Sequence, residues 1–341
     1  MLGALRVLFI LGFFALLSSL STSAGGNEAL VSAPSDAGSL EADFDAVILE
    51  VQNQLLAAPE ASYVYLTHWI KVYNSAQDRP KARAPQTPQR LTAADSFAHD
   101  SNKSWRPNGF PVVSPLWGHS MPYSFADPSR FRPPAPPLQG EAFEASIENV
   151  LIYGDLFSEV RTPEQSLISA FWANGRSTET PPGRWNVIAL EGSRHLPKAK
   201  RIELMLRLNI ALYDAGIAAW DAKYHYSYWR PQTAIAATDV EYSDWEPMMQ
   251  PPFHPEYVSG HSAFSGAGSA ILEHYLRASD FCVIAKELAN LKRCFSGFTQ
   301  AAEEAGLSRI YGGIHFDFSN QAGLKLGRDV AAHVISTVSL P

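Results

Sequence analysis

Residues able to hold a tetrahedral oxyanion lie in three short segments of the second half of the chain. They are Lys223 and Arg230, then Ser259, Gly260 and His261, then Arg309 and His315. A cation and an anionic oxygen about 4 Å apart attract by about 4 kcal/mol at an effective dielectric of about 20, and guanidinium groups add paired hydrogen bonds. These residue types therefore predict an oxyanion site that also has two histidines for chemistry.

The spacing of these residues predicts the elements that position them. Lys223 and Arg230 are seven residues apart, so a helix would place both on one face, and Pro231 would then end that helix. The small-residue run after Gly260 predicts a helix start, where free backbone amides and the helix dipole favour anions. Glycine at this position lets the backbone approach a ligand closely.

Together the three segments resemble the motif of the vanadium-dependent haloperoxidase and type-2 phosphatidic acid phosphatase (PAP2) superfamily, on its soluble bacterial haloperoxidase-like branch. That motif reads K-x6-RP, then PSGH, then SR-x5-H, and the order is the same here. The likeness extends from about Pro181 to Gly327, with Val258 in place of the usual proline. It implies a helical bundle of the PAP2/haloperoxidase type that binds vanadate, or phosphate in the same site.

The resemblance also implies a role for each residue. His315 would be the metal ligand that binds vanadium, or the nucleophile that forms a phosphohistidine, and His261 would be the general acid and base. The oxygens of the anion would be balanced by Lys223, Arg230, Ser259, the Gly260 amide and Arg309. Trp220 and His254 would line the halide side, where a histidine is typical of bromide or iodide oxidation rather than chloride oxidation.

One departure from the family pattern concerns the partner of His315. The family usually has an aspartate four residues after this histidine, where the chain has Ser319, and Asp317 stands two residues after it instead. A carboxylate next to the ring fixes its tautomer and raises its basicity. Whether Asp317 replaces the missing carboxylate is open from the sequence.

Three functions remain open at this stage. The first is a vanadate-dependent haloperoxidase-like enzyme that oxidises bromide or iodide with hydrogen peroxide. The second is a soluble acid phosphatase that acts on phosphate monoesters, and the third is a non-catalytic oxyanion-binding protein. The natural organic substrate and the oligomeric state are also open.

The overall composition predicts a globular protein without an extended basic surface. The 341 residues are 46% hydrophobic and carry a formal net charge of -7 at pH 7. Such a charge gives no general attraction for nucleic acid or for anionic membranes, so we expect neither as a partner. The predicted anion site is therefore a local concentration of positive charge.

The N-terminal residues have the pattern of a secretory signal. Arg6 precedes a short apolar stretch, and small residues at 22–24 suit cleavage, although an uncleaved anchor is the alternative. We expect an exported protein, periplasmic or extracellular, without a stable membrane span in its mature form. The predicted parts are a signal peptide at 1–24, N-terminal helices and a proline-rich wrap at 25–140, and the helical catalytic core at 141–341.

Apolar periodicity predicts a mainly α fold with long proline-rich connections, because strand-like alternation is scarce. The expected helices are 40–73 with a break at Pro59, one from 141, one from 162, then 201–229, 261–276, 281–305 and 320–338. Twelve of the 24 prolines lie between residues 80 and 137, where aromatic residues could pack on the core. Cys282 and Cys294 could form a disulfide or remain two buried thiols.

Overall fold

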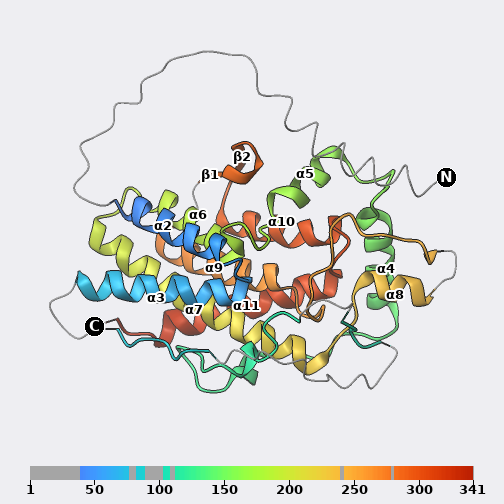
Figure 1. Cartoon of the computed structure of the whole chain (residues 1–341), viewed down its shortest axis with the longest axis horizontal. Helices are drawn as coiled ribbons and strands as arrows, with labels where there is room; N and C mark the ends of the chain where they lie inside the picture. The colour runs from blue at the N-terminus through green and yellow to red at the C-terminus, as the bar shows by residue number, and fades with distance from the viewer. Residues whose placement is uncertain are drawn as a thin grey trace, which may run out of the picture. The chain divides into compact units, whose positions relative to one another are not determined.

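The computed structural model describes residues 39–76, 82–88, 103–107, 112–238, 242–277 and 280–340. Residues from Leu40 onward form one compact unit that consists mainly of α-helices (Figure 1). This confirms the predicted mainly α fold. The predicted signal peptide lies outside the described residues.

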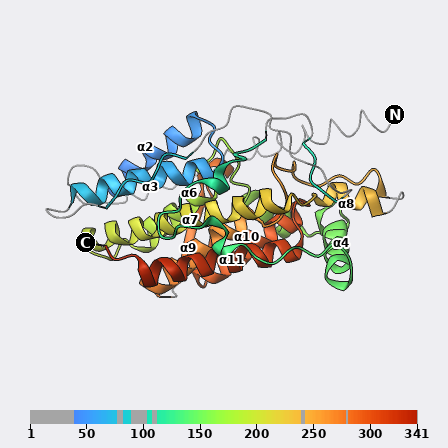
Figure 2. The ribbon, with the colours of Figure 1, turned by 90° about the horizontal axis from the view of Figure 1, so that it is seen from below.

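The long helix α7 (Lys198–Tyr226) is the centre of the bundle. On one side it packs against α3 (Ala58–Ser75), which pairs with α2 (Leu40–Asn53). On the other it packs against α9 (Gly260–Leu276) and α11 (Asp317–Thr337), as Figure 2 shows. Nearly the whole C-terminal half of α7 is buried, so the residues that follow it are held inside the protein.

Helices α9 and α11 pack unusually closely because glycines face the partner backbone. A Cβ atom added at Gly327 would collide with the carbonyl oxygen of Ala263, and one added at Gly266 would collide with the carbonyl oxygen of Leu324. Only glycine fits such contacts without moving a helix. The start of α11 is thereby held next to the start of α9.

The remaining helices are α4 (Glu141–Gly154), α5 (Pro163–Phe171), α6 (Thr180–Gly192), α8 (Pro231–Thr238) and α10 (Phe298–Tyr311), with short 3₁₀ helices at Trp117–His119, Pro128–Phe131 and Lys286–Leu288. Of these helices, α4 and α5 begin where predicted, whereas α6 and α8 were not predicted and α10 begins later than expected. Thr162 caps α5 by accepting from the Gln165 backbone N–H at 3.2 Å, and the Gln165 side chain accepts from the Thr162 backbone N–H at 2.8 Å. Pro59 stands in the first turn of α3, which explains the predicted break.

The described part of the proline-rich segment packs on the bundle, with Trp105, Trp117 and Phe125 buried. Two carboxylates of α7 hold it in place. Asp214 accepts from the backbone N–H groups of residues 123 and 124 at 2.5 and 2.9 Å, and the two oxygens of Asp221 accept from Nε and Nη2 of Arg132 at 2.7 and 2.8 Å. Phe110, another aromatic residue of this segment, lies outside the described residues.

The predicted helix 281–305 is wrong over its first half. Residues Phe281–Ala285 (β1) and Leu291–Phe295 (β2) form an antiparallel hairpin, and α10 begins only at Phe298. Side chains in β1 alternate between buried and accessible, a period of two that the broader apolar pattern obscured. Cys282 and Cys294 stand directly opposite each other and form a disulfide.

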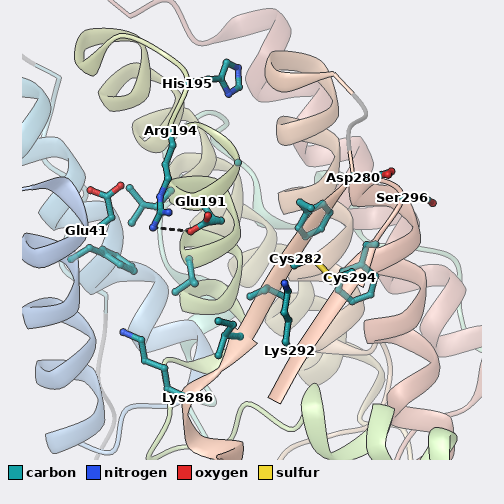
Figure 3. Close-up of a pocket in the computed structure, with 18 of the residues that line it drawn as sticks. Glu41, Glu191, Arg194, His195, Asp280, Cys282, Lys286, Lys292, Cys294 and Ser296 are labelled. Atoms are coloured by element: carbon teal, nitrogen blue, oxygen red, sulfur yellow. Dashed lines mark ion pairs between the residues drawn. A yellow bond between two sulfur atoms is a disulfide. The ribbon is translucent and has the colours of Figure 1, made fainter. Parts of the chain in front are cut away.

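Figure 3 shows this hairpin beside α2 and α6 around a cavity of about 1110 Å³. Charges of both signs line it, including the Glu191–Arg194 ion pair.

None of the helices in the described residues is long and apolar enough to cross a membrane.

We predict that replacing both cysteines by serine lowers the free energy of unfolding by about 3 kcal/mol, because the disulfide closes a short loop in the unfolded chain. Urea unfolding of the purified protein measures this change. Anion binding should be unchanged, since neither cysteine lines the cavity described below. An unfolding free energy equal to that of the wild type would contradict the prediction.

Candidate active site

A cavity of about 330 Å³ lies where α7, α9 and α10 meet the loop before α11. Its lining includes six of the predicted site residues: Trp220, His254, Gly260, His261, Arg309 and His315. Segments almost a hundred residues apart in sequence thus meet at one place. Lys223, Arg230 and Ser259 lie directly behind this lining rather than on it, as their contacts show.

Lys223 and Arg230 converge, but not on one helix face as predicted. Helix α7 ends at Tyr226, where Ser227 takes a left-handed conformation. The next residues are extended, and the Trp229 backbone N–H donates to the carbonyl of Lys103 at 3.2 Å. This pairing with a distant segment ends the helix before Arg230, and Pro231 begins α8 instead of ending α7.

Both cations are fully buried and donate to backbone carbonyls. The Lys223 Nζ lies 2.9 Å from the carbonyl oxygens of Pro255 and Glu256. The Arg230 guanidinium donates to the carbonyls of His254 and Ile314, each at 2.8 Å. The side chains are therefore held in place from both sides of the site.

Ser259 and Gly260 form the predicted helix start. The Ser259 hydroxyl accepts from the Ser262 hydroxyl at 2.8 Å and from its backbone N–H at 3.4 Å, so it caps α9. A Cβ atom at Gly260 would lie 3.3 Å from the Trp220 ring, so glycine permits this packing. The peptide bond between Tyr257 and Val258, where the motif usually has proline, is cis.

Arg309 is 1% exposed and has no carboxylate partner among the described residues. Its guanidinium donates to the Ser308 hydroxyl at 2.9 Å and to the Ser169 carbonyl at 3.0 Å. Burial lowers its pKa to about 9, and burial also lowers the pKa of Arg230 to about 10. Both shifts reflect the cost of keeping a charge away from water.

The charges at the site therefore do not balance within the described residues. Three buried basic groups lie near one buried carboxyl group, that of Glu256, and burial lowers the pKa of Lys223 well below its usual value and raises the pKa of Glu256 to about 7. A buried charge is costly unless it is paired, and an anion in the cavity would supply the missing negative charge. Vanadate or phosphate fits this set of donors.

His315 is held as a defined tautomer. Its Nδ1 lies 2.7 Å from Glu256 Oε1, and its Nε2 lies 3.2 Å from Nη1 of Arg230. A guanidinium only donates, so Nε2 must be the nitrogen with the lone pair and Nδ1 must carry the hydrogen. Burial lowers the pKa of His315, which favours the neutral ring that a ligand or nucleophile needs.

The carboxylate beside His315 thus comes from Glu256 and not from Asp317. The Asp317 carboxylate accepts from the Asn149 amide at 3.0 Å. Sequence reasoning missed Glu256, although a glutamate inside an otherwise apolar segment just before the helix start was a usable signal. The carboxylate partner of His315, which the family pattern places at residue 319, is therefore supplied from another part of the chain.

His261 lines the cavity, and its Nε2 lies 3.1 Å from the carbonyl oxygen of Ala173. A carbonyl only accepts, so the neutral ring carries its hydrogen on Nε2 and has a lone pair on Nδ1. Burial and the charge of Arg309 lower the pKa of His261. The neutral ring can therefore accept a proton.

Trp220 and His254 lie against each other with ring centroids 5.0 Å apart. Both line the cavity, and burial lowers the pKa of His254. Arg230 Nη2 lies 3.1 Å from Nδ1 of His254, which links this pair to the cation cluster. The two residues predicted for the halide side thus share one wall of the cavity.

Comparison with known proteins agrees with this geometry. A family model described as the VCPO second helical-bundle domain matches residues 203–340. The vanadium chloroperoxidase of Curvularia inaequalis is 26% identical over 148 residues, and the match covers 35% of this chain and 24% of that protein.

Solved structures show the same fold. The first bacterial vanadium-dependent iodoperoxidase is 30% identical with a TM-score of 0.64, over 70% of this chain and 61% of that one. The apo-type bacterial vanadium-dependent chloroperoxidase is 17% identical with a TM-score of 0.60, over 79% of this chain and 70% of that one. The chain thus spans less than two thirds of the iodoperoxidase and about a quarter of the curated relative.

The bundle and its cation cluster define a protein of the helical haloperoxidase fold. Residues 203–340, which contain all the predicted site residues, match the family model of the VCPO second helical-bundle domain and resemble vanadium haloperoxidases. This confirms the resemblance seen in the three motif segments.

We predict that Arg309→Ala weakens the binding of orthovanadate or phosphate about 10- to 100-fold, because a charge-assisted hydrogen bond contributes about 1.5–3 kcal/mol. Isothermal titration calorimetry of the purified protein measures the affinity. The matched control is Arg328→Ala, which removes an exposed arginine of α11. Equal affinities for Arg309→Ala and the wild type would show that the anion binds elsewhere.

Proposed function

We propose that this chain is a vanadate-dependent haloperoxidase-like enzyme that oxidises bromide or iodide with hydrogen peroxide. The observation that carries the proposal is a cavity lined by Arg309 and by His315, whose ring is hydrogen-bonded to Glu256, with Lys223 and Arg230 buried directly behind the lining. The 30% identity to a protein described as a vanadium-dependent iodoperoxidase supports it. Trp220 and His254 beside the cations supply a place for the halide.

Each residue of the site would have a separate role in this reaction. His315 would hold vanadate through the Nε2 lone pair once Arg230 Nη1 gives up its contact with that nitrogen, while Lys223, Arg230 and Arg309 balance the negative oxygens, helped by the Gly260 amide. Bound vanadate would supply a Lewis acid that activates hydrogen peroxide without changing its own redox state. His261 would accept a proton from hydrogen peroxide on Nδ1, since its Nε2–H is held by the Ala173 carbonyl.

An acid phosphatase is the second candidate, and Glu256 is the observation that favours it. A nucleophilic histidine needs a partner for its other N–H, and Glu256 supplies one to His315. In that reaction His315 Nε2 would attack the phosphorus of a phosphate monoester, and His261 would protonate the departing alcohol. The cation cluster would serve both reactions.

We also propose that the protein is exported by residues 1–24 and that 141–341 is the catalytic core. The support is the charge and apolar pattern of the first segment and the position of all site residues in the last. Detection of the mature N-terminus by mass spectrometry of protein from the export compartment would test the first point.

We predict that purified protein incubated with orthovanadate brominates and iodinates a phenolic dye when hydrogen peroxide is added, and that protein without vanadate does not. His315→Ala should lower this rate at least about 100-fold, because the ligand is lost. The control His274→Ala removes an exposed histidine of α9 and should keep the rate.

A parallel assay with p-nitrophenyl phosphate separates the alternatives. Phosphate release that vanadate inhibits, without any halogenation, would contradict the peroxidase and establish the phosphatase. Anion binding without turnover in either assay would identify a non-catalytic oxyanion-binding protein.

A further inference from the structure

We propose that Glu256 is the positioning residue that sets the tautomer and orientation of His315, in place of the carboxylate that α11 lacks at position 319. The inference rests on the proposed function in one respect, the role of His315 as the residue that binds the anion. Its direct evidence is the contact between the two side chains. Glu256 does not line the cavity, so it would act on a bound anion through His315.

Glu256 holds both the side chain and the backbone of this segment. Its Oε1 accepts from Nδ1 of His315 at 2.7 Å and from the backbone N–H of Phe316 at 3.0 Å. Glu256 is fully buried and His315 is 2% exposed, so no water competes for these bonds. The imidazole can neither rotate nor exchange its partner without breaking a buried hydrogen bond.

Glu256 is itself firmly held. Its backbone N–H donates to the carbonyl of Tyr228 at 3.0 Å, and its own carbonyl accepts from the Lys223 ammonium at 2.9 Å. The residue therefore connects the end of α7 with the loop before α11. Its position is set by the same lysine that balances the anion.

The two ring nitrogens of His315 have different partners, one a hydrogen-bond donor and the other an acceptor, and these partners fix the tautomer. Arg230 can only donate to Nε2, and the Glu256 carboxylate accepts from Nδ1. Removing the carboxylate would leave a buried Nδ1–H without an acceptor, which costs about 1–3 kcal/mol. The ring would then turn or change tautomer, and the Nε2 lone pair would no longer face the site.

The serine at position 319 leaves space for the carboxylate of Glu256 beside His315. Ser319 is fully buried one turn beyond His315, and its hydroxyl lies beside the Glu256 carboxyl, where it opposes the burial that raises the pKa of Glu256 to about 7. Its carbonyl accepts from the backbone N–H of Ser259 at 3.2 Å, so the start of α11 is held against the segment that carries Glu256. An aspartate at 319 would place a second carboxylate in the space that Glu256 fills.

The two positions should therefore be interchangeable, with one carboxylate present at a time. We expect Glu256→Ala to give a mixture of His315 tautomers and to weaken orthovanadate binding about 10- to 100-fold, as for other groups that orient a ligating histidine. Glu256→Ala combined with Ser319→Asp should restore both. Glu256→Gln should keep the Nδ1–H tautomer, because its amide oxygen can still accept from Nδ1–H.

Nitrogen-15 NMR of histidine-labelled protein without any anion reports the tautomer, with His315→Ala assigning the signal. Calorimetry with orthovanadate reports the affinity. The tautomer does not depend on turnover, so an inactive wild type would defeat the proposed function while leaving this inference testable. If Glu256 only stabilised the fold, moving the carboxylate to residue 319 would not restore the His315 tautomer or the orthovanadate affinity.

Wild-type tautomer and affinity in Glu256→Ala would overturn the inference, as would a double variant that folds but behaves like Glu256→Ala. If Glu256→Ala does not fold, Glu256→Gln carries the test. A protonated Nε2 in that variant would show that the hydrogen bond from Nδ1 does not set the tautomer.

Discussion

The burial of three cations around one cavity is the constraint on which the site depends. Lys223, Arg230 and Arg309 are removed from water, yet the described residues provide one nearby carboxylate. Backbone carbonyls and a serine hydroxyl receive their N–H groups and meet the need for hydrogen bonds, but they do not cancel the charge. Binding of an anion in the cavity would therefore lower the free energy of the protein, because the anion supplies the negative charge that these residues lack.

The helical bundle makes this burial possible. Helix α7 is mostly buried over its second half up to Lys223, so this lysine lies in the interior. Close packing at Gly266 and Gly327 holds the starts of α9 and α11 together, which brings the anion-binding helix start next to His315. The proline-rich segment adds a further constraint, because its pairing with residue 229 ends α7 and directs Arg230 toward the cavity.

The sequence predicted the mainly α fold, the break at Pro59, the cap at Thr162 and the residues that meet at the cavity. These features follow from local periodicity, from capping chemistry or from a motif. It did not predict the end of α7 at Tyr226, because that end depends on hydrogen bonds to a segment more than 120 residues earlier. The hairpin at 281–295 was missed because its strands are short and its stability depends on pairing and a disulfide. Glu256 was missed for a related reason, since its role exists only once α11 and the loop before α9 are side by side.

The most direct test of the account is a crystal structure of the protein soaked with orthovanadate. The account predicts tetrahedral or five-coordinate density in the cavity, bonded to Nε2 of His315, with Lys223, Arg230 and Arg309 facing its oxygens and Glu256 still on Nδ1. Density bonded to another residue, or an empty cavity at a vanadate concentration that saturates binding in solution, would contradict it.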